Sequence, residues 1–124
     1  MRARSFILPD LVSDCPYTLR CNSNCEAVAR ASEAWMLEDA NLSPKRRDAF
    51  LRLRGGELTA ACYPDTDEAC LRVAADFLNF LFSLDDWSDE FSMEDTCGLA
   101  QCVMCVLHDP DDFQTEKAAG KLAK

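Results

Sequence analysis

Residues 76–90 read DFLNFLFSLDDWSDE, a long apolar run that ends in a cluster of acids. Counting back from Asp85 in steps of three and four reaches Leu81, Phe82 and Leu78, which is the spacing of one helix face. This face is apolar for about four turns and becomes carboxylate in the final turn. The stretch therefore predicts a long helix that carries a charged site at the end of an apolar surface.

Four acids, Asp85, Asp86, Asp89 and Glu90, fall within six residues. Crowded carboxylates beside apolar groups are costly unless a cation lies among them, and acids at a helix C-terminus oppose its dipole. Asp85 and Asp89 are four apart and project from the same face, and two such oxygen ligands suit Mg²⁺, which commonly bridges carboxylates to a phosphate. We predict a magnesium site for a diphosphate at the mouth of an apolar pocket. A core helix with a solvated acidic end remains the alternative.

The composition indicates a globular chain: 124 residues, of which 48% are hydrophobic and 28% charged. No run of about 18 apolar residues predicts a membrane span, and the short segment Phe6–Leu8 is stopped by Pro9, so we expect a cytoplasmic protein. The net charge is −9, and residues 61–124 hold 14 of the 22 acids. This imbalance disfavours nucleic acid and favours cations, or an anion that arrives with its metal.

Eight cysteines could suggest a disulfide framework. Without a secretory signal, we interpret them as free thiols that behave as small hydrophobic residues. Cys102 and Cys105 have CxxC spacing and His108 follows, which is a weak zinc half-site. Cys21 and Cys25 could complete it only by chance of folding, so a zinc module stays as a minor alternative.

The remaining patterns predict an all-α fold without a β-sheet, in one domain over residues 1–124. Residues 1–23 are expected to be extended, 24–110 to form helices, and 111–124 to be a polar tail that is frayed or loosely helical. The first helix should bury Val28, Ala31 and Trp35. The helices are expected at about 25–40, 45–53 after a Ser43-Pro44 start, 57–62 after Gly55-Gly56, 67–89 capped by Thr66, and 93–107.

Several motifs together resemble the N-terminal part of fungal, mushroom-type class I sesquiterpene synthases. The resemblance runs from about residue 6 to 112. It is carried by Leu8-Pro9-Asp10-Leu11, Cys15-Pro16, Trp35, Gly55-Gly56, Tyr63-Pro64, Leu71-Arg72, Asp76-Phe77-Leu78-Asn79-Phe80-Leu81-Phe82, the DDxxD motif Asp85-Asp86-Trp87-Ser88-Asp89, and Asp109-Pro110.

The resemblance implies a class I terpenoid-synthase bundle and a carbon–oxygen lyase acting on phosphates. Asp85 would bind Mg²⁺ and Asp89 would support metal binding. Asp86, about 100° round the helix, would act outside the direct ligands or in a salt bridge. Leu78 and Phe82 are candidates for the substrate cavity wall, and plain core packing remains open for both. The implied reaction is Mg-dependent ionisation and cyclisation of farnesyl diphosphate to a sesquiterpene, with release of diphosphate.

Other parts of the family pattern cannot be located, including the second metal motif and the arginines that sense diphosphate. We therefore interpret the chain as a partial synthase that is inactive alone. Its apolar area around Leu78, Phe82, Val103 and Val106 should then be exposed. The alternative is a small non-enzymatic helical module that binds a divalent cation or a basic partner through its acidic half. Product, prenyl chain length and oligomeric state stay open.

Overall fold

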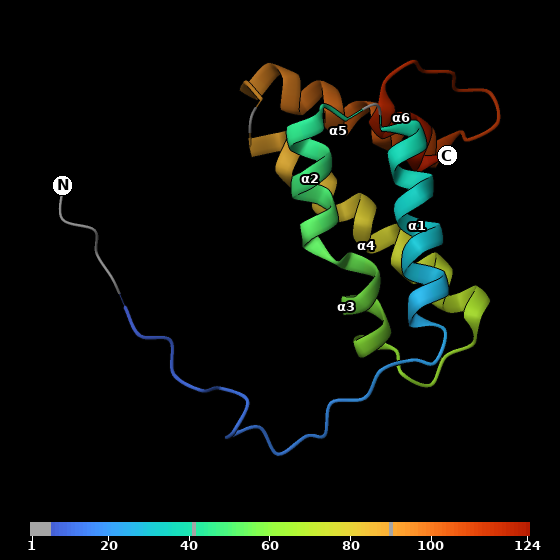
Figure 1. Ribbon diagram of the computed structural model, residues 1–124. Coiled ribbons are helices and arrows are strands. Elements are labelled where there is room, and N and C mark those ends of the chain that lie inside the picture. Colours follow the sequence, from blue (N-terminus) through green and yellow to red (C-terminus); the bar gives the residue numbers. More distant parts are fainter. Residues whose placement is uncertain (1–5, 41, 90) are drawn as a thin grey trace.

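The computed structural model describes residues 6–40, 42–89 and 91–124 and confirms the all-α prediction, since no strand occurs in these ranges. The expected extension of residues 1–5, and Glu90 of the acidic cluster, lie outside the described residues. Within the described ranges, no helix combines the length and apolar character that crossing a bilayer requires. The helices are α1 (Cys25–Asp39), α2 (Pro44–Leu53), α3 (Gly55–Cys62), α4 (Glu68–Asp89), α5 (Met93–His108) and α6 (Ala118–Ala123) (Figure 1).

The helix starts follow local capping chemistry. The Ser43 hydroxyl accepts a hydrogen bond from the backbone N–H of Arg46, as predicted. At α4 the prediction is wrong by one residue, because Asp67, not Thr66, accepts the cap bond, from the N–H of Cys70 (2.9 Å). A carboxylate at this position also favours the positive end of the helix dipole.

The centre of the bundle is formed by α1, α3 and α4, which pack against one another (Figure 1). The prediction for the buried face of α1 is wrong in part: Val28 is buried, but Ala31 is exposed and Trp35 only half-buried. The prediction placed the large side chain of Trp35 in the buried face of α1. In the structure, the buried face includes the small residues Ala29 and Ser32, which let the helices approach closely. The buried positions are Val28, Ala29, Ser32 and Met36 on α1 and Leu71, Ala75, Asn79, Ser83 and Trp87 on α4.

A polar layer separates two apolar clusters in this core. The amide of Asn79 donates to the hydroxyl of Ser32 (2.9 Å), and both residues are fully buried. The other amide atom, Asn79 Oδ1, has no hydrogen-bond partner within the described residues. A Cβ placed on Gly55 would lie 2.0 Å from this oxygen, so the start of α3 can approach α4 only through a glycine. Arg54 lies between α2 and α3 and has a left-handed backbone conformation, with a φ of 56°. This turn allows the start of α3 to lie close to α4.

Of the two alternatives expected for the C-terminal tail, frayed or loosely helical, residues 118–123 follow the helical one, and they are docked instead of loose. These residues form α6, which contacts α1, α4 and α5. Ala119 and Leu122 are buried in the same cluster as Met36 and Trp87. Two apolar side chains one turn apart are enough to dock a short helix when the core offers a matching site.

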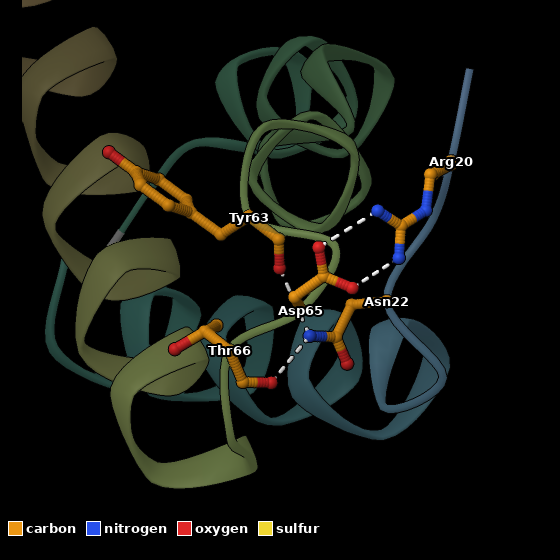
Figure 2. Close-up of polar contacts among 5 residues, drawn as sticks. All are labelled: Arg20, Asn22, Tyr63, Asp65 and Thr66. Carbon is orange, nitrogen blue, oxygen red and sulfur yellow. Dashed lines mark hydrogen bonds and ion pairs between the residues drawn. The ribbon is translucent and has the colours of Figure 1, made fainter. Parts of the chain in front are cut away.

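The N-terminal segment runs away from the helices and is attached only at its base (Figure 1). All residues from 6 to 21 are exposed. At the base, the side-chain amide of the buried Asn22 donates to the backbone carbonyls of Tyr63 (3.0 Å) and Thr66 (2.7 Å). Figure 2 shows this contact beside the ion pair of Arg20 and Asp65, both of which are exposed.

Candidate functional site

The exposed side of α4 carries a line of apolar residues that ends at a carboxylate. Val73, Phe77 and Leu81 are four residues apart, and 70%, 60% and 45% of their surfaces are exposed. Asp85 is the next residue in this series and is also exposed. We call the three apolar residues the α4 ridge. The ridge shares Leu81 with the predicted apolar face but is otherwise a different row of the helix, because the predicted face runs through Leu78 and Phe82, which are half-buried.

Two hollows at the end of α4 include aspartates of the acidic motif. The first, of about 380 Å³, lies between α4 and α5 and includes Asp85; we call it the α4–α5 hollow. Its other lining residues are mainly apolar: Leu81, Leu84, Ser88, Thr96, Leu99, Ala100, Val103 and Met104. One of the two predicted metal ligands, Asp85, thus lies beside an apolar concavity.

The second hollow, of about 460 Å³, lies between α2 and α4 and includes Asp86 and Asp89. We call it the α2–α4 hollow. Lys45 and Arg46 of α2 line it as well, so cationic side chains face these two acids. This provides part of the charge compensation that acids at a helix C-terminus require. No local sequence pattern predicts this contact between α2 and the end of α4, because the two segments are about forty residues apart in the chain.

The three aspartates themselves are unpaired in the part of the chain that the structure describes. Asp85, Asp86 and Asp89 are exposed, and none of their carboxylates accepts a hydrogen bond or forms an ion pair with a described residue. Free carboxylate oxygens one turn apart fit the donor preference of Mg²⁺, which is held in proteins by one or two carboxylates together with waters and substrate phosphates. Asp85 and Asp89 each offer this donor chemistry, but they line different hollows: Asp85 lies at the α4–α5 hollow, and Asp89 lies with Asp86 at the α2–α4 hollow.

None of the four residues expected at the cavity wall or in the exposed apolar patch is fully exposed. Leu78 and Phe82 are half-buried, and neither lines the two hollows beside the acidic motif. Val103 is half-buried and lines the α4–α5 hollow. Val106 is fully buried, so the expectation that it contributes to an exposed patch is wrong. The exposed apolar surface lies instead on the α4 ridge and on Met104 and Leu107 of α5.

The zinc alternative gains no support from the positions of the cysteines. Cys102 is buried, Cys105 is half-buried and His108 is exposed. Across residues 6–40, 42–89 and 91–124, no group of three or more His, Cys, Asp or Glu side chains is arranged to hold a metal ion. All eight cysteines are free thiols in the structure.

A further group of titratable side chains lies around a hollow of about 520 Å³ between α1 and α3. It includes Glu33 and Glu57. Burial, and next the neighbouring Glu57 carboxylate, raise the pKa of Glu33, while Arg54 opposes this rise. A raised carboxyl pKa means that the folded state binds the proton more tightly than the unfolded state.

Replacing Glu33 with glutamine is expected to stabilise the fold at pH 7. The favourable contribution of Glu33 to the free energy of unfolding is fully present below its ordinary pKa of about 4.3. This contribution is lost as the pH rises through the raised pKa of the folded state. Glutamine resembles the protonated acid, so the gain should shrink towards zero below about pH 4. Urea unfolding of both proteins across pH 3.5–7.5 measures this. Glu38→Gln, at an exposed α1 position, is the control; an equal gain there would show that only net charge matters.

Among the described residues, the structure is a helical bundle in which an exposed apolar row on α4 leads to Asp85 beside a concavity, and the motifs at this site resemble those of class I terpene synthases. The chain is similar to fungal sesquiterpene synthases along nearly its whole length. Sesquiterpene synthase 3 of Postia placenta is 41% identical over 122 residues, which are 98% of this chain and 33% of that protein. Alpha-muurolene synthase of Coprinopsis cinerea is 45% identical over 130 residues, or 97% of this chain and 30% of the relative.

Sesquiterpene synthase Agr1 of Cyclocybe aegerita is 37% identical over 121 residues, covering 98% of this chain and 35% of the relative. No protein-family model matches the chain. The chain therefore spans about a third of the length of these relatives. The resemblance to fungal sesquiterpene synthases is confirmed at 34–45% identity.

Proposed function

We propose that this chain forms the aspartate-bearing wall of a class I sesquiterpene synthase. In this proposal Asp85 and Asp89 hold Mg²⁺, and the metal supplies Lewis-acid neutralisation of a diphosphate leaving group. The observation that carries the proposal is the α4 ridge ending at Asp85, whose carboxylate has no partner among the described residues, in a chain 41% identical to a sesquiterpene synthase over 122 residues. The substrate would be a prenyl diphosphate, and the names of the relatives favour farnesyl diphosphate.

Each group of residues around the motif has a different proposed role. The α4–α5 hollow offers apolar surface for the hydrocarbon portion of the substrate, next to the Asp85 carboxylate. Asp86, which faces the hollow with Lys45 and Arg46, would act through charge and orientation instead of direct metal contact. Leu78 and Phe82 remain proposed residues of the substrate cavity wall. They would contact the substrate where it extends from the α4–α5 hollow along α4.

Magnesium and inorganic diphosphate are expected to bind this chain synergistically. A diphosphate adds oxygen ligands to those of Asp85 and Asp89, so each ligand should tighten the binding of the other at least about tenfold. Isothermal titration calorimetry with magnesium, in the presence and absence of diphosphate, measures this coupling. Asp85→Asn and Asp89→Asn should each abolish it.

Asp112→Asn is the matched control, because Asp112 is an exposed aspartate outside the motif. Binding of magnesium without any coupling to diphosphate would contradict the proposal and favour the simple cation-binding module. Loss of coupling in all three variants would show that overall negative charge, and not the motif, is responsible.

The 124-residue chain is expected not to convert farnesyl diphosphate to a cyclic product on its own. An allylic cation must be shielded from water, and both hollows beside the motif are open to solvent. Incubation of the purified chain with farnesyl diphosphate and magnesium, followed by gas chromatography of the extract, tests this. Detection of a cyclic sesquiterpene that disappears in Asp85→Asn would contradict the expectation.

A further inference from the structure

Two of the free cysteines lie on either side of one tight turn. Cys21 ends the exposed segment before the bundle, and Cys25 is the first residue of α1. Between them, the backbone N–H of Cys25 donates to the carbonyl of Asn22 (3.1 Å), and the N–H of Asn24 donates to Oδ1 of Asn22 (2.9 Å). The chain therefore reverses its direction at residues 22–25, which brings the flanking cysteines close together.

Both ends of this turn are fixed to the bundle. Asn22 is only 4% exposed, and its side-chain amide donates to the carbonyls of Tyr63 and Thr66 (Figure 2). Its backbone N–H also donates to the carbonyl of Ala60 (3.1 Å). At the other end, α1 packs against α3 and α4. The backbone that carries the two cysteines is therefore ordered, whereas an unfolded chain samples many separations of the same residues.

The two thiols lie at one hollow and interact with each other. Cys21 and Cys25 both line the hollow of about 520 Å³ between α1 and α3. Burial, and next hydrogen bonding and charge from the neighbouring thiol of Cys21, raise the pKa of Cys25. The Glu57 carboxylate acts in the same direction, and Arg54 opposes it. Cys25 is thus kept as a neutral thiol beside the more exposed thiol of Cys21.

Other thiols with recorded contacts have partners that are not cysteines. Cys15 donates to the carbonyl of Tyr17 (3.7 Å), and the sulfur of Cys102 lies 3.4 Å from the hydroxyl of Thr115. Interacting thiols that flank a single turn have the proximity that a disulfide requires, and formation of the bond needs only side-chain rotation. The pair is also local in sequence, so its proximity depends on the turn and its anchor alone.

We propose that Cys21 and Cys25 form a reversible oxidation site, at which a low-molecular-weight disulfide such as oxidised glutathione converts the two thiols to an intrachain disulfide. The thiolate of Cys21 attacks one sulfur of the reagent and releases one glutathione thiol. Cys25 then loses its proton to solvent, attacks the Cys21 sulfur of the mixed disulfide and releases the second glutathione. The two cysteines are oxidised, and the reagent is reduced to two thiols. The inference does not depend on the proposed function.

The disulfide would tie the end of the exposed segment to the start of α1. Because the turn orders the pair in the folded chain, closing the bond there loses less conformational freedom than closing it in the unfolded chain. Oxidation is therefore easier in the folded state. By linkage, the disulfide stabilises the folded state by the same factor by which folding favours oxidation.

Equilibration with glutathione tests the proposal, because trypsin cleaves after Arg20 and Arg30 and releases residues 21–30 as a peptide whose only cysteines are Cys21 and Cys25. The full chain is incubated with increasing oxidised glutathione at a fixed concentration of reduced glutathione. Remaining thiols are then alkylated, and the peptide is weighed by mass spectrometry. We expect an unalkylated peptide that has lost two hydrogen atoms. Half-oxidation should need at least about tenfold less oxidised glutathione in the folded chain than in urea.

Cys25→Ser is the matched control, and its peptide should carry one glutathione at Cys21 and no internal bond. Three results would overturn the proposal. Equal midpoints for the folded and unfolded chains would show that the turn does not order the pair. A mixed disulfide that persists at Cys21 in the native chain would show that Cys25 does not reach it. A bond between residues 21–30 and another cysteine peptide would show that a different thiol is the partner.

Discussion

Gly56→Ala is expected to lower the free energy of unfolding by about 1–3 kcal/mol, although alanine is the better helix former. A Cβ at this position would lie 2.5 Å from the Cα and 2.6 Å from the Cβ of Ala29 on α1. The first of these is a backbone atom, so α1 and α3 would have to separate. This clash outweighs the gain in helix propensity, which is at most about 1 kcal/mol. Urea unfolding followed by circular dichroism measures the difference.

Gly98→Ala on α5 is the matched control and should have the opposite sign. The nearest atom to a Cβ at Gly98 is the Nζ of Lys117 at 3.6 Å, at the end of a flexible side chain. Here alanine meets no obstacle, and the free energy of unfolding should rise by about 0.5–1 kcal/mol. A stabilising Gly56→Ala would show that α1 and α3 are not in close contact in solution.

Asn22→Ala is expected to cost about 2–3 kcal/mol of stability. Its side-chain amide donates to two backbone carbonyls, and its Oδ1 accepts from the N–H of Asn24 (2.9 Å). Alanine removes all three bonds and leaves the carbonyls of Tyr63 and Thr66 without a donor in a partly buried environment. The same unfolding measurement detects the loss. Asn22→Asp should be at least as harmful, since a carboxylate facing two carbonyl oxygens is repelled.

Asp65→Asn provides the comparison for this anchor. The ion pair of Asp65 with Arg20 joins side chains that are 68% and 60% exposed, and exposed pairs contribute about 0–1 kcal/mol. The effect of Asp65→Asn should therefore be small and should disappear in high salt. A cost as large as that of Asn22→Ala would mean that the surface ion pair, and not the buried amide, holds the loop before α4.

Element boundaries were predictable wherever the signal is local. Ser43 and Pro44 mark the start of α2, and the long apolar period marks α4. For α6 the sequence left frayed and loosely helical states open, because six residues are too few to hold a helix in water, and the helix is fixed by docking Leu122 into the core. The roles of Gly55 and Gly56 were missed for a related reason: they are conformational breakers in sequence, but close-contact residues in the fold.

In the candidate site, too, some features follow from local sequence and others depend on how the helices pack. The helical spacing of Asp85 and Asp89, and the apolar face that leads to them, follow from the chain alone. The separation of the acids between two hollows does not, since it depends on where α2 and α5 pack against α4. Lys45 and Arg46 carry no signal that links them to residues forty positions away.

The sequence alone determined that this chain is helical, that one helix brings apolar surface to a carboxylate end, and that its motifs resemble those of fungal sesquiterpene synthases. These properties are periodic or contiguous, so neighbouring residues encode them. Only the tertiary structure decided which side of α4 is buried. Close packing selected the small and polar side chains Ala75, Asn79 and Ser83 over the larger apolar ones, and left Phe77 and Leu81 facing outward. Hydrophobicity sets how much surface should be buried, whereas the fit between helices sets which residues are buried.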